Sequence, residues 1–171
     1  FAGPFEVFSS TRLEKKSTAQ IYKIPSPFYT FTVSEKNKKI IANGDQLISS
    51  KFVFKSCPKL DILIIPGGIG TRSLLSNKNV LSWIKTHSKI PFLASVCTGS
   101  LLLAKAELLS NKKATSHWGA LDLLKKISPS TKIVNNKRFT FDKYYTSSGV
   151  SAGIDMSLHI VEKIYGKKIA K

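Results

Sequence analysis

The sequence predicts an α/β domain built on a doubly wound, mostly parallel sheet with helices on both faces. Two short runs, residues 61–65 and 92–96, are almost wholly apolar, as expected for strands that are buried on both sides. Each run ends in a glycine-containing turn, and segments with apolar residues at helical spacing follow. Strands that alternate with helices in this order form a three-layer α/β/α arrangement.

The N-terminal third carries weaker patterns. Pro4, close to the start of an apolar segment, predicts a short helix within residues 1–12. Alternation over residues 19–24 predicts a strand that ends at Pro25. Residues 29–33 and 39–42 are expected to form a hairpin or a strand pair near an edge, around residues 34–38, and Asn43-Gly44-Asp45 is expected to be a turn.

The rest of the chain continues the alternation of helices and strands. Helices are expected over 77–87, from residue 98 onward, over 119–127, and in a last segment with an apolar stripe of Ile154, Leu158, Val161 and Ile164. Strands are expected over 114–116 and 132–134, and a hairpin is expected from 139–142 and 144–147. No repeat or linker marks a boundary, so residues 1–171 are expected to form one domain.

Composition narrows the class of protein. The apolar runs are too short for a transmembrane helix, and nothing at the N-terminus resembles a signal peptide. Two cysteines, Cys57 and Cys97, do not make a disulfide framework, so a reduced, cytoplasmic setting is expected. Since the first residue is Phe1 rather than Met, we expect the sequence to be an excerpt.

The formal net charge of +17 raises the question of a polyanionic partner. The basic residues are overwhelmingly lysines, scattered as singles and pairs, and the arginines are only Arg12, Arg72 and Arg138. Planar recognition of phosphate favours arginine, and no aromatic residues interleave with a basic block. We therefore favour a solvated lysine-rich surface over a nucleic-acid-binding face.

Cys97 is the strongest candidate for chemistry. It lies in the turn between the apolar run 92–96 and the helical segment that Thr98-Gly99-Ser100 opens. Such a turn projects a side chain from the carboxyl end of a strand, over the N-terminus of the next helix, where ligands bind in open α/β sheets and an anion such as a thiolate is favoured. The alternative, a buried structural cysteine, is common for free cysteines. The position favours a nucleophile.

The loop Pro66-Gly67-Gly68-Ile69-Gly70 follows the other apolar strand. It does not match a dinucleotide-binding fingerprint, because Ser73 stands at the third glycine position, and it lacks the Gly-Lys-Ser/Thr ending of a phosphate-binding P-loop. Its backbone N–H groups could form an oxyanion hole beside Cys97. It could equally be a tight strand-to-helix turn, and both readings can hold together.

The three histidines are weaker candidates for functional residues. His117 follows a strand that we expect to neighbour the strand of Cys97, so it could polarise the thiolate or contact substrate, or be a hydrogen-bonded histidine at a strand end. His87 near a helix C-terminus and His159 within the last helix are expected to be structural. The histidines and cysteines show no metal-ligand spacing, so we expect no metal and no cofactor.

The combined motifs resemble the ThiJ/PfpI superfamily, whose fold is of the class-I glutamine-amidotransferase type with a flavodoxin-like sheet. They occur in family order over nearly the whole chain: Gly3-Pro4-Phe5-Glu6-Val7-Phe8, Asp61-Ile-Leu-Ile-Ile-Pro-Gly-Gly68, Ser95-Val-Cys-Thr-Gly-Ser100, Ala114-Thr-Ser-His-Trp118 and Gly149-Val-Ser-Ala-Gly-Ile-Asp155. Proteolytic and amidotransferase-like members carry histidine after the cysteine, whereas this chain has Thr98. Cys-Thr-Gly-Ser resembles isonitrile hydratases and the sensor halves of AraC-type regulators.

The hydratase resemblance implies particular roles for these residues. Cys97 would attack the isonitrile carbon, Thr98 would be an assisting hydroxyl, and the product would be an N-substituted formamide. Backbone N–H groups near Gly67, Gly68 and Thr98 would line the site, and His117, Gly149 and Val150 would belong to its pocket. An acidic residue that handles protons lies, in the family, just before the segment matching Phe1, as does the first strand, so both are expected upstream of this sequence.

The resemblance also leaves other functions open. A small-molecule sensor domain of an AraC-type regulator would require a DNA-binding domain after Lys171, because this domain is not expected to bind nucleic acid directly. Sister branches imply glyoxalase, deglycase or stress-protein activity. All of these readings imply a small-molecule ligand, and the family resemblance implies a homodimer with no membrane contact.

Overall fold

The computed structural model describes residues 1–14, 20, 23–37 and 39–171. A four-stranded sheet forms its centre, in the order β5 (Ile62–Ile65), β6 (Phe92–Val96), β10 (Tyr145–Ser147) and β9 (Phe139–Phe141). β5 and β10 both run parallel to β6, and only β9 is antiparallel to its neighbour. The predicted mostly parallel α/β fold is confirmed.

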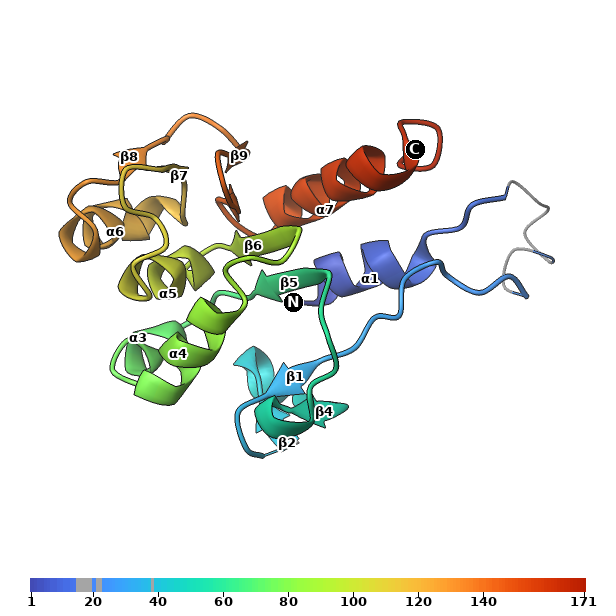
Figure 1. The fold of residues 1–171 in the computed structure, drawn as a ribbon, viewed down its shortest axis with the longest axis horizontal. Coiled ribbons are helices and arrows are strands. Elements are labelled where there is room, and N and C mark those ends of the chain that lie inside the picture. The colour runs from blue at the N-terminus through green and yellow to red at the C-terminus, as the bar shows by residue number, and fades with distance from the viewer. Residues whose placement is uncertain (15–19, 21–22, 38) are drawn as a thin grey trace.

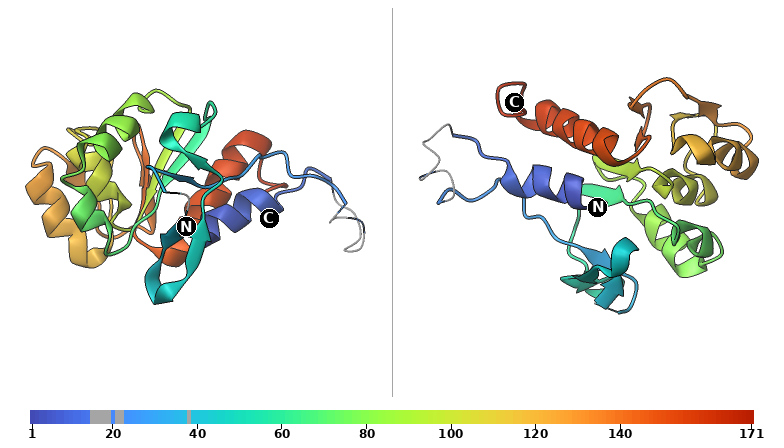
Figure 2. Two further views of the ribbon diagram at one scale, coloured as in Figure 1. Left: turned by 90° about the horizontal axis from the view of Figure 1, so that it is seen from below. Right: turned by 180° about the vertical axis from the view of Figure 1, so that it is seen from behind.

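Helices cover both faces of this sheet (Figures 1 and 2). α1 (Ala2–Ser10) and α7 (Val150–Tyr165) pack side by side on one face. The other face carries α3 (Thr71–Leu74), α4 (Lys78–Thr86), α5 (Gly99–Lys105) and α6 (Leu121–Ile127). The left view of Figure 2 shows the sheet edge-on between these two layers.

Strand β6 belongs to both hydrophobic cores, because its side chains alternate between the two faces. Leu93 packs with the buried residues of α4, α5 and α6. Ala94 and Val96 pack with Phe8 of α1 and Met156 of α7. Burial on both sides explains why this run is almost wholly apolar, with Ser95 as its one polar residue, and why its bounds are the predicted ones.

Three small two-stranded sheets flank the central one. β1 (Val33–Ser34) pairs in parallel with β4 (Phe52–Val53), and β7 (Lys113–Ala114) pairs in parallel with β8 (Lys132–Ile133). β2 (Lys39–Ile41) pairs antiparallel with β3 (Leu47–Ser49) across the Asn43–Asp45 3-10 turn, where Gly44 has φ +71°. A further 3-10 turn, Phe54–Ser56, follows β4.

Two predictions for the N-terminal third need comment. The hairpin of 29–33 with 39–42 is wrong: β2 pairs instead with β3, since the Asn43-Gly44-Asp45 turn reverses the chain directly between them. The strand predicted over 19–24 falls largely on residues 19, 21 and 22, which lie outside the described residues. The predicted helix near the N-terminus is confirmed as α1.

A carboxylate ties this N-terminal region to α4. Asn77 caps α4, where its side-chain oxygen accepts hydrogen bonds from the backbone N–H groups of Asn79 and Val80. The side-chain amides of Asn77 and Asn79 both donate to the Glu35 carboxylate, at 2.8 and 3.2 Å. These hydrogen bonds lower the pKa of Glu35 below its ordinary value.

The C-terminal half follows the predictions closely. β9 and β10 form the expected hairpin, with Thr140 opposite Thr146. α7 begins at Val150, and Val161 of the predicted stripe is fully buried together with Met156 and Ile160, whereas Leu158 of that stripe is 37% exposed. Among the described residues, no helix has both the length and the apolarity needed to cross a bilayer.

Candidate active site

Cys97 forms a sharp elbow between β6 and α5. Its φ of +56° lies in the left-handed region, which costs a non-glycine residue about 1–3 kcal/mol unless the surroundings hold it. Hydrogen bonds hold both the backbone N–H and the backbone carbonyl of Cys97. Its N–H donates to the Ser147 carbonyl at 2.9 Å, and its carbonyl accepts from the hydroxyls of Ser100 and Ser116 at 3.1 Å each. The thiol is half-buried.

The glycine loop packs directly against this elbow. A Cβ atom on Gly67 would lie 2.7 Å from the Cys97 Cβ, 2.7 Å from the Thr98 N and 2.8 Å from the Val96 carbonyl oxygen. A Cβ atom on Gly99 would overlap the Ile65 carbonyl oxygen. Only glycine at these two positions lets the ends of β5 and β6 approach so closely, so the sequence motif has a steric cause.

Thr98 points toward the glycine loop. Its hydroxyl oxygen accepts a hydrogen bond from the Gly68 N–H at 2.9 Å, donates to the Gly68 carbonyl at 3.1 Å, and lies 3.0 Å from the Thr71 hydroxyl. Thr98 is also buried. In this structure the hydroxyl therefore fixes the loop beside Cys97, which is a positioning contact.

One of the three backbone N–H groups expected to line the site is already hydrogen-bonded. The Gly68 N–H donates its hydrogen bond to the Thr98 hydroxyl, so it is not free for an oxyanion. The expectation that Gly68 supplies a backbone donor to the site is not met in this structure. The positive φ of Gly68, +136°, is a backbone conformation that side chains disfavour. The other two expected donors, the Gly67 and Thr98 N–H groups, belong to backbone segments that the absence of a Gly67 side chain lets approach each other closely.

His117 does not follow a strand adjacent to β6, and the residue before it, Ser116, makes the contact with the elbow. The strands beside β6 are β5 and β10, and β7, which precedes His117, pairs with β8 instead. The expectation that the strand before His117 neighbours the strand of Cys97 is therefore wrong. His117 Nδ1 accepts from the Gly119 N–H at 3.2 Å and caps the 3-10 turn Trp118–Ala120, while Ser116 supplies the contact with Cys97.

A groove opens beside the elbow. Its volume is about 500 Å³, and it lies between the residues after β7, the segment 135–138 and the start of α7. Gly149, an expected pocket residue, lines it, and Trp118 lines it in place of His117. Val150, the other expected pocket residue, is 87% exposed. Ser116, whose hydroxyl bonds to the Cys97 carbonyl, forms part of the wall.

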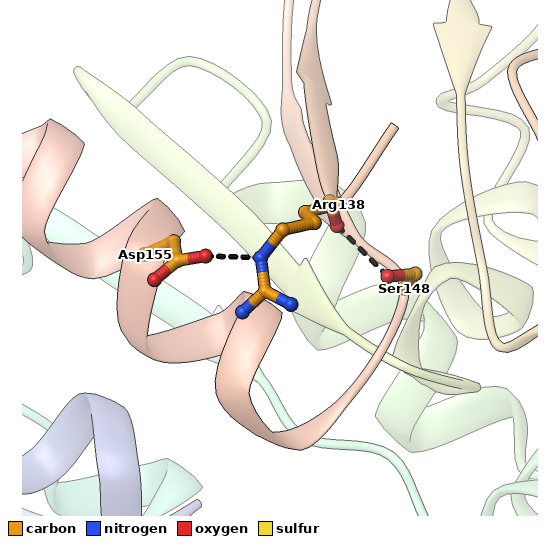
Figure 3. Close-up of polar contacts among 3 residues, drawn as sticks. All are labelled: Arg138, Ser148 and Asp155. Atoms are coloured by element: carbon orange, nitrogen blue, oxygen red, sulfur yellow. Dashed lines mark hydrogen bonds and ion pairs between the residues drawn. The ribbon is translucent and has the colours of Figure 1, made fainter. Parts of the chain in front are cut away.

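Sequence reasoning missed the two charged residues of this groove, Lys137 and Arg138. Arg138 lines the groove and forms an ion pair through Nε with Asp155 of α7 (Figure 3). The Arg138 carbonyl accepts hydrogen bonds from the Ser148 N–H at 2.8 Å and the Ser148 hydroxyl at 3.0 Å. The available signal was the last motif, Gly149 to Asp155, which supplies the carboxylate.

The described residues contain no group of three or more His, Cys, Asp or Glu side chains suited to hold a metal ion. The second cysteine, Cys57, lies apart from the elbow, after β4, and its thiol contacts the Pro58 carbonyl at 3.4 Å. Burial raises the pKa of the Cys57 thiol.

Comparison with known proteins decides the family. The model of the DJ-1/PfpI family matches residues 25–163, which is most of the chain. The chain belongs to the DJ-1/PfpI family. A ThiJ/PfpI family protein from Pseudomonas syringae is 28% identical, with a TM-score of 0.83 over 99% of this chain and 64% of that one. The elbow and its glycine loop thus lie in a known DJ-1/PfpI fold.

Two curated relatives of the chain differ in function. Isonitrile hydratase from Pseudomonas putida is 34% identical over 69% of this chain and 51% of its own length. The HTH-type transcriptional regulator GbdR from Pseudomonas aeruginosa is 27% identical over 81% of this chain and 38% of its own length. The chain therefore spans about half or less of the curated relatives that it matches.

Proposed function

We propose that Cys97 is the nucleophile of a hydratase that adds water to a small electrophile, with an isonitrile as the leading substrate. The observation that carries this proposal is the left-handed elbow, which holds the thiol at the carboxyl end of β6 and is followed by Thr98 rather than by a histidine base. The similarity of this chain to isonitrile hydratase, over 69% of its length, supports an isonitrile as the leading substrate.

The reaction is balanced by one thiol and one water. The Cys97 sulfur bonds to the isonitrile carbon, and a proton equivalent to that of the thiol is added to the same carbon, which gives a thioimidate, R–N=CH–S. Water then adds to this carbon, the C–S bond breaks, and the sulfur regains a proton. The product is the N-substituted formamide, R–NH–CHO, and the cysteine is restored.

The surrounding residues have supporting roles in this scheme. The Gly67 and Thr98 N–H groups stabilise the negative charge that develops during water addition. The Thr98 hydroxyl acts through its hold on Gly68. The acidic residue that the resemblance implies upstream of Phe1 remains part of the proposal, as do a homodimer, a single folded domain and a cytoplasmic location. Light scattering and cell fractionation of the full-length protein test the assembly and the location.

Turnover of cyclohexyl isocyanide by the full-length protein tests the function. We expect N-cyclohexylformamide to accumulate, and we expect Cys97→Ala to abolish its formation. Cys57→Ala is the matched control, because the second cysteine lies apart from the elbow, and it should keep parental activity. A Cys97→Ala protein as active as the parent contradicts the mechanism.

A sensor domain is the second candidate, and the similarity to the regulator GbdR favours it. Under this alternative the same pocket binds a small molecule without turnover, and a DNA-binding domain is encoded after Lys171. The sequence of the complete gene separates the two: a helix-turn-helix domain after Lys171 favours the sensor. Consumption of methylglyoxal that depends on Cys97 would instead favour the glyoxalase or deglycase branch.

A further inference from the structure

The charged residues that line the groove beside the elbow are all positive. Its lining includes two cationic side chains, Lys137 and Arg138, two asparagines, Asn135 and Asn136, and no carboxylate. The Asp155 carboxylate, which pairs with Arg138, is not among the lining residues. A concave surface with cations and amides but no acid favours a ligand that carries a negative charge.

Arg138 is held in a defined orientation within this lining. Its Nε contacts Asp155, and Ser148 fixes its backbone carbonyl through two hydrogen bonds. Figure 3 shows the Asp155 carboxylate in contact with Nε, and no contact drawn to either Nη atom. Within the described part of the chain, neither Nη atom has a hydrogen-bond partner. A guanidinium anchored through Nε keeps the two-pronged donor geometry that matches a carboxylate.

The charged wall is connected to the nucleophile through the backbone. Ser148, which holds Arg138, follows Ser147, whose carbonyl accepts the Cys97 N–H. Ser116, another lining residue, donates to the Cys97 carbonyl. A molecule that occupies the groove therefore lies against the residues that hold the elbow.

The lining of the groove also includes apolar side chains. Trp118 is 81% exposed although it is a large aromatic residue, and Leu121 and Ala152 belong to the same lining. An exposed tryptophan next to convergent polar groups is typical of ligand sites. The groove thus combines cationic and apolar side chains around about 500 Å³, a volume suited to a small molecule.

We propose that this groove binds the carboxylate of a small anionic substrate, with Arg138 as the specificity-determining residue. This inference rests on the proposed function only for the reacting group: if Cys97 hydrates isonitriles, the preferred substrate is an isocyano-carboxylate rather than a neutral isonitrile. The carboxylate pairs with the free edge of Arg138, Lys137 adds positive potential, and the carbon skeleton packs on Trp118.

Binding tests the groove independently of turnover. The probes are N-formylglycine, the hydration product of isocyanoacetate, and its ethyl ester, titrated into full-length Cys97→Ala protein by calorimetry. We expect the acid to bind at least about tenfold more tightly than the ester, since hydrogen bonds between charged groups are among the stronger ones. We also expect its affinity to fall as salt is added.

Substitutions identify the residue responsible. Arg138→Gln should weaken binding of the acid about tenfold and leave binding of the ester unchanged, and Arg138→Lys should retain part of the preference. The matched control is Lys168→Gln, which removes the same charge from an exposed position after the far end of α7. Because the Arg138–Asp155 pair is exposed, these variants should unfold at nearly the parental temperature.

Turnover of isocyanoacetate and of its ethyl ester separates the two proposals. A preference for the acid in both binding and turnover supports both of them. Tight, Arg138-dependent binding of N-formylglycine without turnover of any isonitrile supports the groove and refutes the hydratase. Equal affinity for acid and ester, or an Arg138→Gln protein that binds the acid like the parent, overturns the groove proposal whatever the turnover shows.

Discussion

Gly67→Ala tests whether the glycine loop is packed as tightly against the elbow as the structure indicates. The added Cβ would lie 2.7 Å from the Cys97 Cβ and the Thr98 N, so the two segments must separate by about 0.7 Å to restore ordinary contact. The Cys97 N–H is hydrogen-bonded to Ser147, which resists that movement. Overpacking of this kind costs about 1–3 kcal/mol. For a chain of this size, about 2 kcal/mol lowers the melting temperature by about 4–8 °C.

The assay combines thermal unfolding followed by circular dichroism with the rate of Cys97 alkylation by iodoacetamide. Gly70→Ala is the matched control. It lies in the same loop with φ −59° and ψ −17°, and an added Cβ meets nothing within 4 Å, so it should be neutral or stabilise by about 0.4–1 kcal/mol. If Gly67→Ala matches Gly70→Ala in both stability and alkylation rate, the close approach of loop and elbow is wrong.

Three further predictions concern groups with defined partners. Thr98→Val leaves the Gly68 N–H unpaired and should lower the free energy of unfolding by about 1–3 kcal/mol in urea titrations, whereas Thr98→Ser should lose much less. The lowered pKa of Glu35 contributes stability above its unfolded value of 4.5 that is lost as pH falls through the folded pKa. The melting temperatures of Glu35→Gln and the parent should therefore converge as the pH is lowered below 4.5. Because burial raises the pKa of Cys57, mass spectrometry should find Cys57 alkylated more slowly near pH 7 than a free thiol in peptide form.

The strands buried on both faces were the parts of the fold that sequence could predict. β6 begins and ends at the predicted residues because Leu93, Ala94 and Val96 all contribute to cores, which keeps the run almost wholly apolar. Its one polar residue, Ser95, is also buried. The elbow follows from the same reasoning, because an apolar strand that meets Cys97-Thr98-Gly99 can only turn there.

Pairing between strands could not be read in the same way. All three residues of β2 are exposed, so their side chains give no alternation that would identify β3 as the partner. The error over His117 has a related cause. Which strand lies beside β6 depends on the order of strands in the finished sheet, and β10 takes the place that a local reading gives to β7.

The role of Arg138 in the groove could not be predicted from its neighbours in the sequence either. Arg138 is one of 27 basic residues and has no distinguishing neighbours in the sequence. Its orientation depends on Asp155, which is 17 positions later, and on Ser148 at the end of β10. A charge becomes specific there only when the β9–β10 hairpin and α7 bring these groups together.

The left-handed backbone of Cys97 also has a consequence for protein engineering. Glycine adopts such a conformation without the steric cost that a side chain incurs, so Cys97→Gly would relieve about 1 kcal/mol of strain while deleting the thiol. A library selected only for heat resistance would therefore favour loss of the nucleophile, as stability and activity often oppose each other at strained sites. Directed evolution of this protein should apply a thiol-dependent screen in every round.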